Sequence, residues 1–277
     1  MERQTHQIGK NILSFLEAGK AGNPTILFLH GIPASAELWR EVMIQATERG
    51  YHCLAPDMPG YGGTEVKDKA YYTFPETAEL FITWLKELGL DDIWLVGHDL
   101  GGAVAQLMLT QKEALFLKVS LSNVVTADTY PVPVIEKLIK AAKMGLFYWM
   151  ARLGRFEMGK QYKGMKRVFI RNTSFSQEDF QRIFYDGKFH SPKMAAKFQR
   201  MLARLNHSAT LENMPALAKV SLAVHLIWAM NDRFQPWEVA GKILEKTFTS
   251  VKITQIENCG HFLQLDAPDD YVEALFS

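Results

Sequence analysis

The chain has 277 residues, of which 48% are hydrophobic and 22% are charged, which supports a sizeable core and excludes a disordered chain. Its 31 basic and 30 acidic residues give a net charge of +1, and no block of one sign indicates nucleic acid or an anionic membrane as a partner. Cys53 and Cys259 form neither a metal-type spacing nor a disulfide framework, and the polar N-terminus shows no secretory signal, so we expect a cytoplasmic protein.

Short apolar runs alternate with longer amphipathic runs, a pattern typical of βα units around a parallel sheet. The run at 25–29 is continuously apolar, as expected for a strand covered on both faces. The longest apolar runs are too short to span a bilayer. In chain order we predict strands at 11–17, 25–29, 51–55, 93–96, 115–121, 222–228 and 251–256, and helices at 36–49, 74–88, 103–110, 238–247 and 269–276.

One segment, residues 126–210, breaks this alternation. It has no convincing strand and is rich in Lys, Arg, Met, Phe and Tyr at helical spacings. We therefore predict a core made of residues 1–125 and 211–277, with a mostly parallel twisted sheet flanked by helices, and a helical cap made of residues 126–210. A cap in this place would cover the carboxyl edge of the sheet, where ligands bind in open α/β sheets.

The segment Gly97-His98-Asp99-Leu100-Gly101 lies between a predicted strand and a predicted helix. This is the geometry of a nucleophile elbow, usually written Gly-x-Ser-x-Gly, which presents its central side chain at the mouth of the sheet. Here Asp99 replaces the serine, and no Gly-x-Ser-x-Gly occurs elsewhere in the chain. A carboxylate suits attack on an electrophilic sp³ carbon, which gives an alkyl ester that water must then cleave. The competing interpretation is a serine enzyme that has lost its serine.

The second step needs a base and an oxyanion hole. We predict His261, directly after the last strand, as the base, and Asp232, just past the preceding strand, as the acid that orients it. Backbone N–H groups of Ile32 and Leu100 would form the oxyanion hole. The alternative position for the acid, after the strand 115–121, holds Asn123 with Asp128 further on, and neither suits the role as well as Asp232.

These residues resemble the aspartate-nucleophile branch of the α/β-hydrolase superfamily, which contains epoxide hydrolases, haloalkane dehalogenases and haloacetate dehalogenases. The resemblance covers the predicted core and implies an α/β-hydrolase fold with an inserted helical cap. It rests on motifs that occur in the expected order, namely His30-Gly31-Ile32-Pro33, Asp57-Met58-Pro59-Gly60-Tyr61-Gly62, Gly97-His98-Asp99-Leu100-Gly101-Gly102, Asp232 and Gly260-His261-Phe262.

Departures from the family pattern bear on the substrate. The resemblance implies a Trp at position 100 and an Asn at position 32 for a haloalkane dehalogenase, and an Arg at position 100 for a haloacetate dehalogenase, but the chain has Leu100 and Ile32. Epoxide hydrolases use cap tyrosines to protonate the leaving oxygen, and usually carry Trp at position 100. Tyr148 stands near the first expected cap position, Phe198 occupies the second, and the other candidates in the segment are Tyr130, Tyr162 and Tyr185.

We therefore predict a hydrolase that uses no metal or organic cofactor. The reaction that the sequence favours is the opening of an epoxide to a diol. The alternatives are a dehalogenase with atypical halide ligands and a non-catalytic small-ligand receptor on a hydrolase scaffold. For leaving-group contacts we name Tyr148, Tyr185 and Tyr130. The expected partner is a small, largely apolar molecule, with neither nucleic acid nor a membrane as partner and a homodimer as the candidate assembly.

Overall fold

The computed structural model describes residues 1–154 and 156–277, with residues 69 and 70 described by their backbone alone. An eight-stranded sheet forms its centre, in the order β1-β2-β4-β3-β5-β6-β7-β8. β1 and β2 pair antiparallel, as do β2 and β4, and every later pair is parallel. The strands are β1 (Glu2–Ile8), β2 (Asn11–Ala18), β3 (Thr25–Leu29), β4 (His52–Pro56), β5 (Ile93–His98), β6 (Phe116–Ser122), β7 (Val224–Ala229) and β8 (Val251–Ile256).

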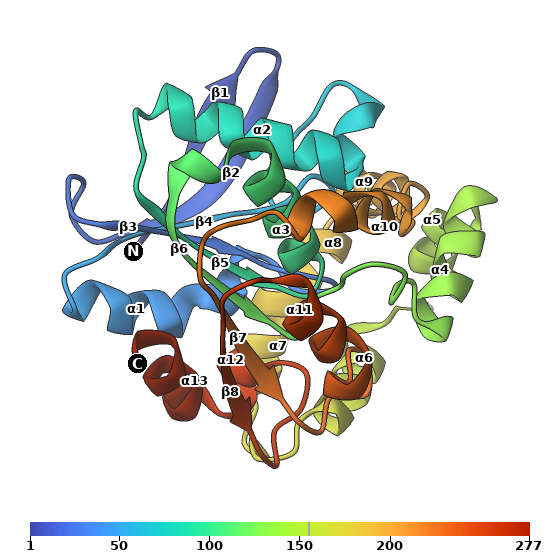
Figure 1. Ribbon diagram of the computed structural model, residues 1–277. Coiled ribbons are helices and arrows are strands. Elements are labelled where there is room, and N and C mark those ends of the chain that lie inside the picture. Colours follow the sequence, from blue (N-terminus) through green and yellow to red (C-terminus); the bar gives the residue numbers. More distant parts are fainter. Residues whose placement is uncertain (155) are drawn as a thin grey trace.

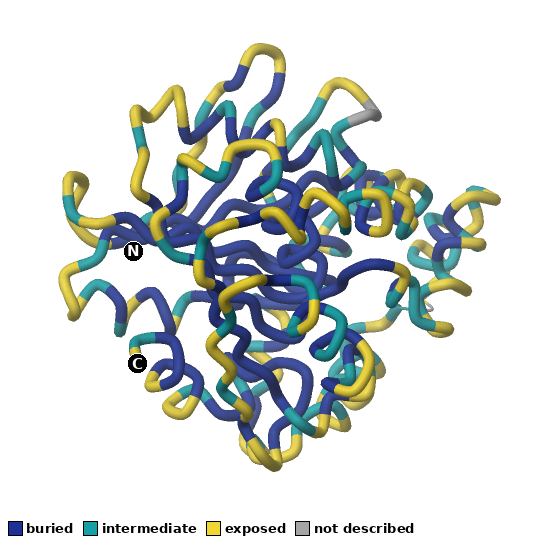
Figure 2. The backbone as a smooth tube through the Cα atoms, in the orientation of Figure 1, coloured by how far each residue is buried: buried dark blue, intermediate teal, exposed yellow. Residues whose placement is uncertain are grey.

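Helices cover both faces of the sheet, so the protein has three layers (Figure 1). Because successive side chains of a strand point to opposite faces, Leu27 and Leu29 of β3 join one hydrophobic cluster while Ile26 and Phe28 join the other. The inner strands β3, β4, β5 and β7 are accordingly buried over their whole length, whereas the edge strands β1 and β8 are mostly exposed or half-buried (Figure 2). One face carries α1 (Arg40–Glu48), α12 (Leu263–Asp266) and α13 (Pro268–Phe276), and the other carries α2 (Phe74–Glu87), α3 (Leu100–Lys112), α10 (Ser208–Leu217) and α11 (Lys242–Thr247).

The chain between β6 and β7 is helical throughout its regular elements, and α4 and α5 stand at the edge of the molecule, away from the sheet (Figure 1). A π-helical turn over Gln181–Tyr185 connects α7 to α8. No helix of the described residues is both long and apolar enough to cross a membrane. The helices of this segment before α10 are α4 (Pro133–Lys143), α5 (Leu146–Arg152), α6 (Met158–Met165), α7 (Gln177–Phe180), α8 (Asp186–Phe189) and α9 (Pro192–Leu202).

The predicted fold class is confirmed, since the sheet is mostly parallel and flanked by helices. Each predicted strand is present, with ends that differ by up to two residues. Among the described strands and α-helices outside the predicted cap, β1 and α12 were not predicted, and neither was α10, which spans the predicted boundary at residue 210. β1 is an edge strand with a polar, largely exposed sequence, so it carries almost no hydrophobic signal, and α12 is a single short turn. The boundaries of the proposed cap at 126 and 210 stay a prediction.

Candidate active site

Asp99 lies on the sharp turn that joins β5 to α3. Its backbone has φ of +52° and ψ of −121°, which is a strained conformation for any residue other than glycine. The neighbouring glycines make this turn possible, because a side chain on Gly101 would meet the backbone of Leu29 and one on Gly102 would meet Val124. The Gly-x-Asp-x-Gly-Gly pattern therefore lets α3 begin in direct contact with the strands beneath it, with Asp99 at the carboxyl edge of the sheet.

The carboxylate of Asp99 is buried and anchored on one side by the loop that follows β3. Its Oδ1 accepts a hydrogen bond of 2.7 Å from the backbone N–H of Ile32, and the N–H of Leu100 also donates to the carboxylate. Gly31 lacks a side chain where a Cβ would run into this carboxylate. Burial raises the pKa of Asp99, and this effect outweighs the opposing influence of His261 and of the two N–H groups.

His261 connects Asp99 to a second buried carboxylate. Its Nε2 lies 3.7 Å from Oδ2 of Asp99, and its Nδ1 lies 2.7 Å from Oδ2 of Asp232. Asp232 is also held by the N–H of Phe234, which donates to Oδ1 over 2.7 Å. With Nδ1 donating its proton to Asp232, the imidazole presents Nε2 toward Asp99, where it can accept a proton.

Asn123, the residue at the alternative acid position, supports Asp232. Its Nδ2 donates to Oδ2 of Asp232 over 2.8 Å, and its Oδ1 accepts from the N–H of Ala229 over 2.8 Å. It has φ of +43°, which Asn adopts more readily than most residues. Asp128 is exposed on the following loop. The end of β6 therefore supplies an amide that fixes the acid of β7, a role that sequence reasoning missed.

Burial and neighbouring charges act in opposite directions on the pKa values of His261, Asp232 and His98. Burial disfavours the imidazolium, but Asp232 and Asp99 outweigh it and raise the pKa of His261. Burial also opposes ionisation of Asp232, but His261 and the backbone N–H groups lower its pKa. His98 packs against His261 with ring centroids 4.7 Å apart, and burial keeps its pKa well below the usual range. His98 is thus a neutral support beneath the base, bonded through Nδ1 to the carbonyl of Ser122.

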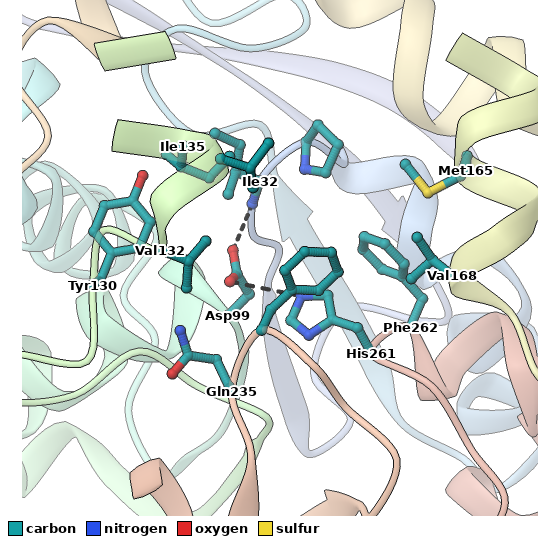
Figure 3. A pocket seen from close by; sticks show the side chains of 13 residues that line it. Ile32, Asp99, Tyr130, Val132, Ile135, Met165, Val168, Gln235, His261 and Phe262 are labelled. Carbon is teal, nitrogen blue, oxygen red and sulfur yellow. Dashed lines mark hydrogen bonds and ion pairs between the residues drawn. The ribbon is translucent and has the colours of Figure 1, made fainter. Parts of the chain in front are cut away.

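A largely apolar cavity of about 160 Å³ opens in front of Asp99 and His261. Figure 3 shows Tyr130, Val132 and Gln235 on one side of Asp99, and Met165, Val168 and Phe262 on the other. The hydroxyl of Tyr130 and the Oε1 of Gln235 are buried and have no hydrogen-bond partner among the described residues. Buried polar groups normally have a partner, so these two are suited to a bound molecule.

The three tyrosines named from the sequence lie in different places. Tyr130 lines the cavity, whereas Tyr148 on α5 and Tyr185 beside α8 are half-buried and do not. Tyr185 packs instead against Phe189, with ring centroids 5.3 Å apart. Gln235 was not singled out from the sequence, and its signal was weak: it lies three residues after Asp232 in the same loop.

The described part of the chain was also inspected for a cluster of metal-ligating side chains. Among residues 1–154 and 156–277, no group of three or more His, Cys, Asp or Glu side chains is arranged to hold a metal ion. The polar groups that face the cavity are Asp99, His261, Tyr130 and Gln235. These groups can attack carbon, move a proton and donate or accept hydrogen bonds.

Comparison with known proteins identifies the family of the chain. Residues 26–274 match the alpha/beta hydrolase family. Haloalkane dehalogenase 2 of Mycobacterium tuberculosis is 27% identical over 262 residues, which cover 91% of this chain and 86% of that protein. Epoxide hydrolase 2 of Siraitia grosvenorii is 34% identical over 107 residues, 38% of this chain and 34% of that protein.

A solved haloalkane dehalogenase from Bradyrhizobium elkani superposes with a TM-score of 0.82 at 20% identity, covering 99% of this chain and 96% of that one. At that identity the superposition shows the shared fold. The family match spans most of the chain, including the loops that carry Ile32, Asp99, Asp232 and His261. The chain is therefore an enzyme of the α/β-hydrolase family, with haloalkane dehalogenases and epoxide hydrolases among its relatives.

Proposed function

We propose that the protein hydrolyses small electrophilic molecules through an ester on Asp99, and that its preferred substrate is an epoxide, which it opens to a diol. The observation that carries this proposal is the arrangement of Asp99 between the N–H of Ile32 and the Nε2 of His261, at the bottom of an apolar cavity. No serine occupies the turn where an α/β hydrolase carries its nucleophile. The residues 126–210 are proposed to act as the cap of this cavity.

In the first step, Oδ2 of Asp99 attacks a ring carbon of the epoxide. The carbon–oxygen bond breaks, its electron pair stays on the leaving oxygen, and Tyr130 donates a proton to that oxygen. Burial and the charge of Asp99 keep the pKa of Tyr130 well above its usual value, so the hydroxyl is protonated and able to donate. The unpartnered state of this hydroxyl supports an oxygen leaving group.

In the second step, water attacks the ester carbonyl carbon and His261 accepts its proton at Nε2. Negative charge develops on Oδ1, the oxygen that already accepts from Ile32, with Leu100 as second donor. One such donor contributes about 3 kcal/mol in related acyl chemistry. Asp232 stabilises the imidazolium that forms. Collapse of the intermediate breaks the bond between the carboxyl carbon and Oδ2. Oδ2 leaves on the substrate carbon, takes the proton from His261 and becomes the second hydroxyl of the diol. The water oxygen completes the carboxyl group of Asp99, whose remaining proton replaces the one that Tyr130 donated.

Dehalogenation is the second candidate, because the relative that matches over 91% of this chain is named a haloalkane dehalogenase. Attack by Asp99 would then expel a halide, and no proton donor would be required. The hydroxyl of Tyr130 and the amide of Gln235 would then donate hydrogen bonds to the leaving halide. Measuring diol formation and halide release on styrene oxide and 1-bromohexane separates the two candidates.

The mechanism is tested by replacing His261 with Gln and searching for a covalent adduct by mass spectrometry. Loss of the base should block the second step, so each molecule of His261→Gln should gain the mass of the substrate on a peptide that contains Asp99. The control is the double variant His261→Gln with Asp99→Asn, which should gain none. Turnover by the unaltered protein without any adduct in His261→Gln would exclude Asp99 as nucleophile. Binding without turnover in the unaltered protein would favour a receptor.

A further inference from the structure

A second cavity adjoins the one in front of Asp99. The two share Ile32, Pro33, Ile135 and Met165, so they are neighbouring parts of one apolar space. We call the second the aromatic chamber. It measures about 130 Å³, and six phenylalanines line it: Phe147, Phe156, Phe180, Phe184, Phe189 and Phe198.

Lys188, on α8, is a cationic side chain in the wall of this aromatic chamber. Only 3% of the residue is exposed. Its Nζ donates hydrogen bonds to the backbone carbonyls of Pro33 and Phe184. Among the described residues, no carboxylate forms an ion pair with it, although Asp186 favours its charge through space. A buried ammonium normally has a carboxylate partner, because desolvation of an unpaired charge is costly.

Lys197 is a useful contrast within the same molecule. It is also buried, but its Nζ donates to three carbonyls, those of Tyr61 at 3.3 Å, Gly62 at 2.6 Å and Thr64 at 3.0 Å. An ammonium has three N–H donors, so the donors of Lys197 are all used. Lys197 lines neither of the two cavities. Lys188 has two carbonyl acceptors and therefore retains one donor beside the chamber.

The electrostatics of Lys188 agree with an incomplete site. Burial lowers its pKa to about 7, since Asp186 offsets little of the desolvation. A negatively charged oxygen in the chamber would accept the remaining N–H and neutralise the buried charge. The side chain of Gln161 lines the same chamber and offers a second donor.

We propose that the aromatic chamber binds the far end of the substrate and that Lys188 holds a carboxylate there. The substrate would then be an apolar molecule with its electrophilic carbon at Asp99 and a carboxylate at its other end. This inference rests on the proposed function for the electrophilic carbon, but the carboxylate site itself is defined by the chamber and by Lys188.

The first experiment measures binding without chemistry. Octanoate and 1-octanol have chains of equal length and differ in the end group, and calorimetry on the intact protein gives the dissociation constant of each. We expect octanoate to bind about tenfold to a hundredfold more tightly, as for a hydrogen bond between charged groups. Equal binding of the two, or tighter binding of the alcohol, would overturn the proposal without any variant being needed.

The second experiment assigns the site to Lys188. Lys188→Met should remove the preference for octanoate over 1-octanol, whereas Lys197→Met should keep it. A preference that survives in a folded Lys188→Met protein would overturn the assignment, and Lys188→Gln serves if the Met variant fails to fold. Because neither ligand reacts, the result is independent of the ester mechanism: a Lys188-dependent preference with no adduct in His261→Gln would keep the chamber site and reject the proposed function.

Discussion

Two parts of the candidate active site, which we call the floor and the roof of its cavities, are built in different ways. The floor consists of Ile32, Asp99, Asn123, Asp232 and His261, which come from loops at the carboxyl ends of five strands and are joined by hydrogen bonds or short contacts. The roof comes from the helices between β6 and β7 and consists mainly of stacked phenylalanines with Lys188 among them.

The difference indicates that the floor positions the reacting groups, whereas the roof buries the substrate. A connected network of buried polar groups holds its members in one arrangement, which a reaction requires. An apolar roof contributes burial, which is less directional and depends on the shape of the space. We therefore expect substitutions in the floor to change kcat by orders of magnitude and substitutions in the roof to change KM by modest factors.

The largest effect is expected for Asp232→Asn in the floor. The amide cannot stabilise the imidazolium by charge and can hold His261 in the wrong tautomer, so kcat should fall about 10³- to 10⁴-fold. The matched control is Asp128→Asn, at the exposed aspartate after β6, which should leave kcat unchanged. Steady-state kinetics measure both. A larger loss in Asp128→Asn than in Asp232→Asn would show that the acid is Asp128, after β6, and not Asp232, after β7.

A smaller effect is expected at Tyr130, where floor and roof meet. Tyr130→Phe removes the proton donor, so epoxide opening should slow about 10²-fold while any halide release changes little. Tyr148→Phe is the control, because Tyr148 does not line the cavity. Single-turnover rates of ester formation give the comparison. Equal losses with both leaving groups would mean that Tyr130 positions the substrate and does not donate the proton.

The pH dependence of the rate of ester hydrolysis should report the interaction between His261 and the carboxylate of Asp232. His261 must be neutral to accept a proton from water, and Asp232, the carboxylate that stays charged while Asp99 is esterified, favours the imidazolium and so raises its pKa. The rate of ester hydrolysis should therefore fall as pH drops through that pKa, by about tenfold for each pH unit below it. Asp232→Asn should shift this midpoint to lower pH, because the variant loses a carboxylate that favours the imidazolium. A shift to higher pH would contradict the network.

The smallest effect is expected in the roof. Phe156 stacks on Phe189 with ring centroids 5.3 Å apart, and it is only half-buried. Phe156→Leu should raise KM by about tenfold or less and leave kcat nearly unchanged, because it removes part of an apolar wall. The same assay on the floor and roof variants compares them directly. A drop in kcat that exceeds the change in KM would show that the roof also positions the reacting groups.

The sequence predicted the floor better than the roof, for a physical reason. Each floor residue follows a strand, and the carboxyl ends of parallel strands meet at one edge, so chain order alone brings Asp99, Asp232 and His261 together. The loop after β6 has no periodic pattern, so the sequence could not distinguish Tyr130 from Tyr148. The surroundings of Lys188 depend on how short helices pack against each other, which no spacing rule determines.

Two further features could not be predicted from the sequence, namely strand β1 and the role of Asn123. The edge strand β1 lacks an apolar face, so its pairing with β2 comes from backbone hydrogen bonds that leave no trace in hydrophobicity. Asn123 occupies the alternative position for the acid, and the structure shows its amide bonded to Asp232. A two-ended amide at a positive φ is recognisable only once both of its partners are known.

The contact between His261 and Asp99 has a consequence for the timing of the proposed reaction. The negative charge of Asp99 is one of the influences that raise the pKa of His261. An ester on Asp99 is uncharged, so its formation would remove that influence and make the imidazole easier to deprotonate. His261 would therefore be available as a base once the ester has formed. In this way the charge interaction between His261 and Asp99 would set the order of the two half-reactions.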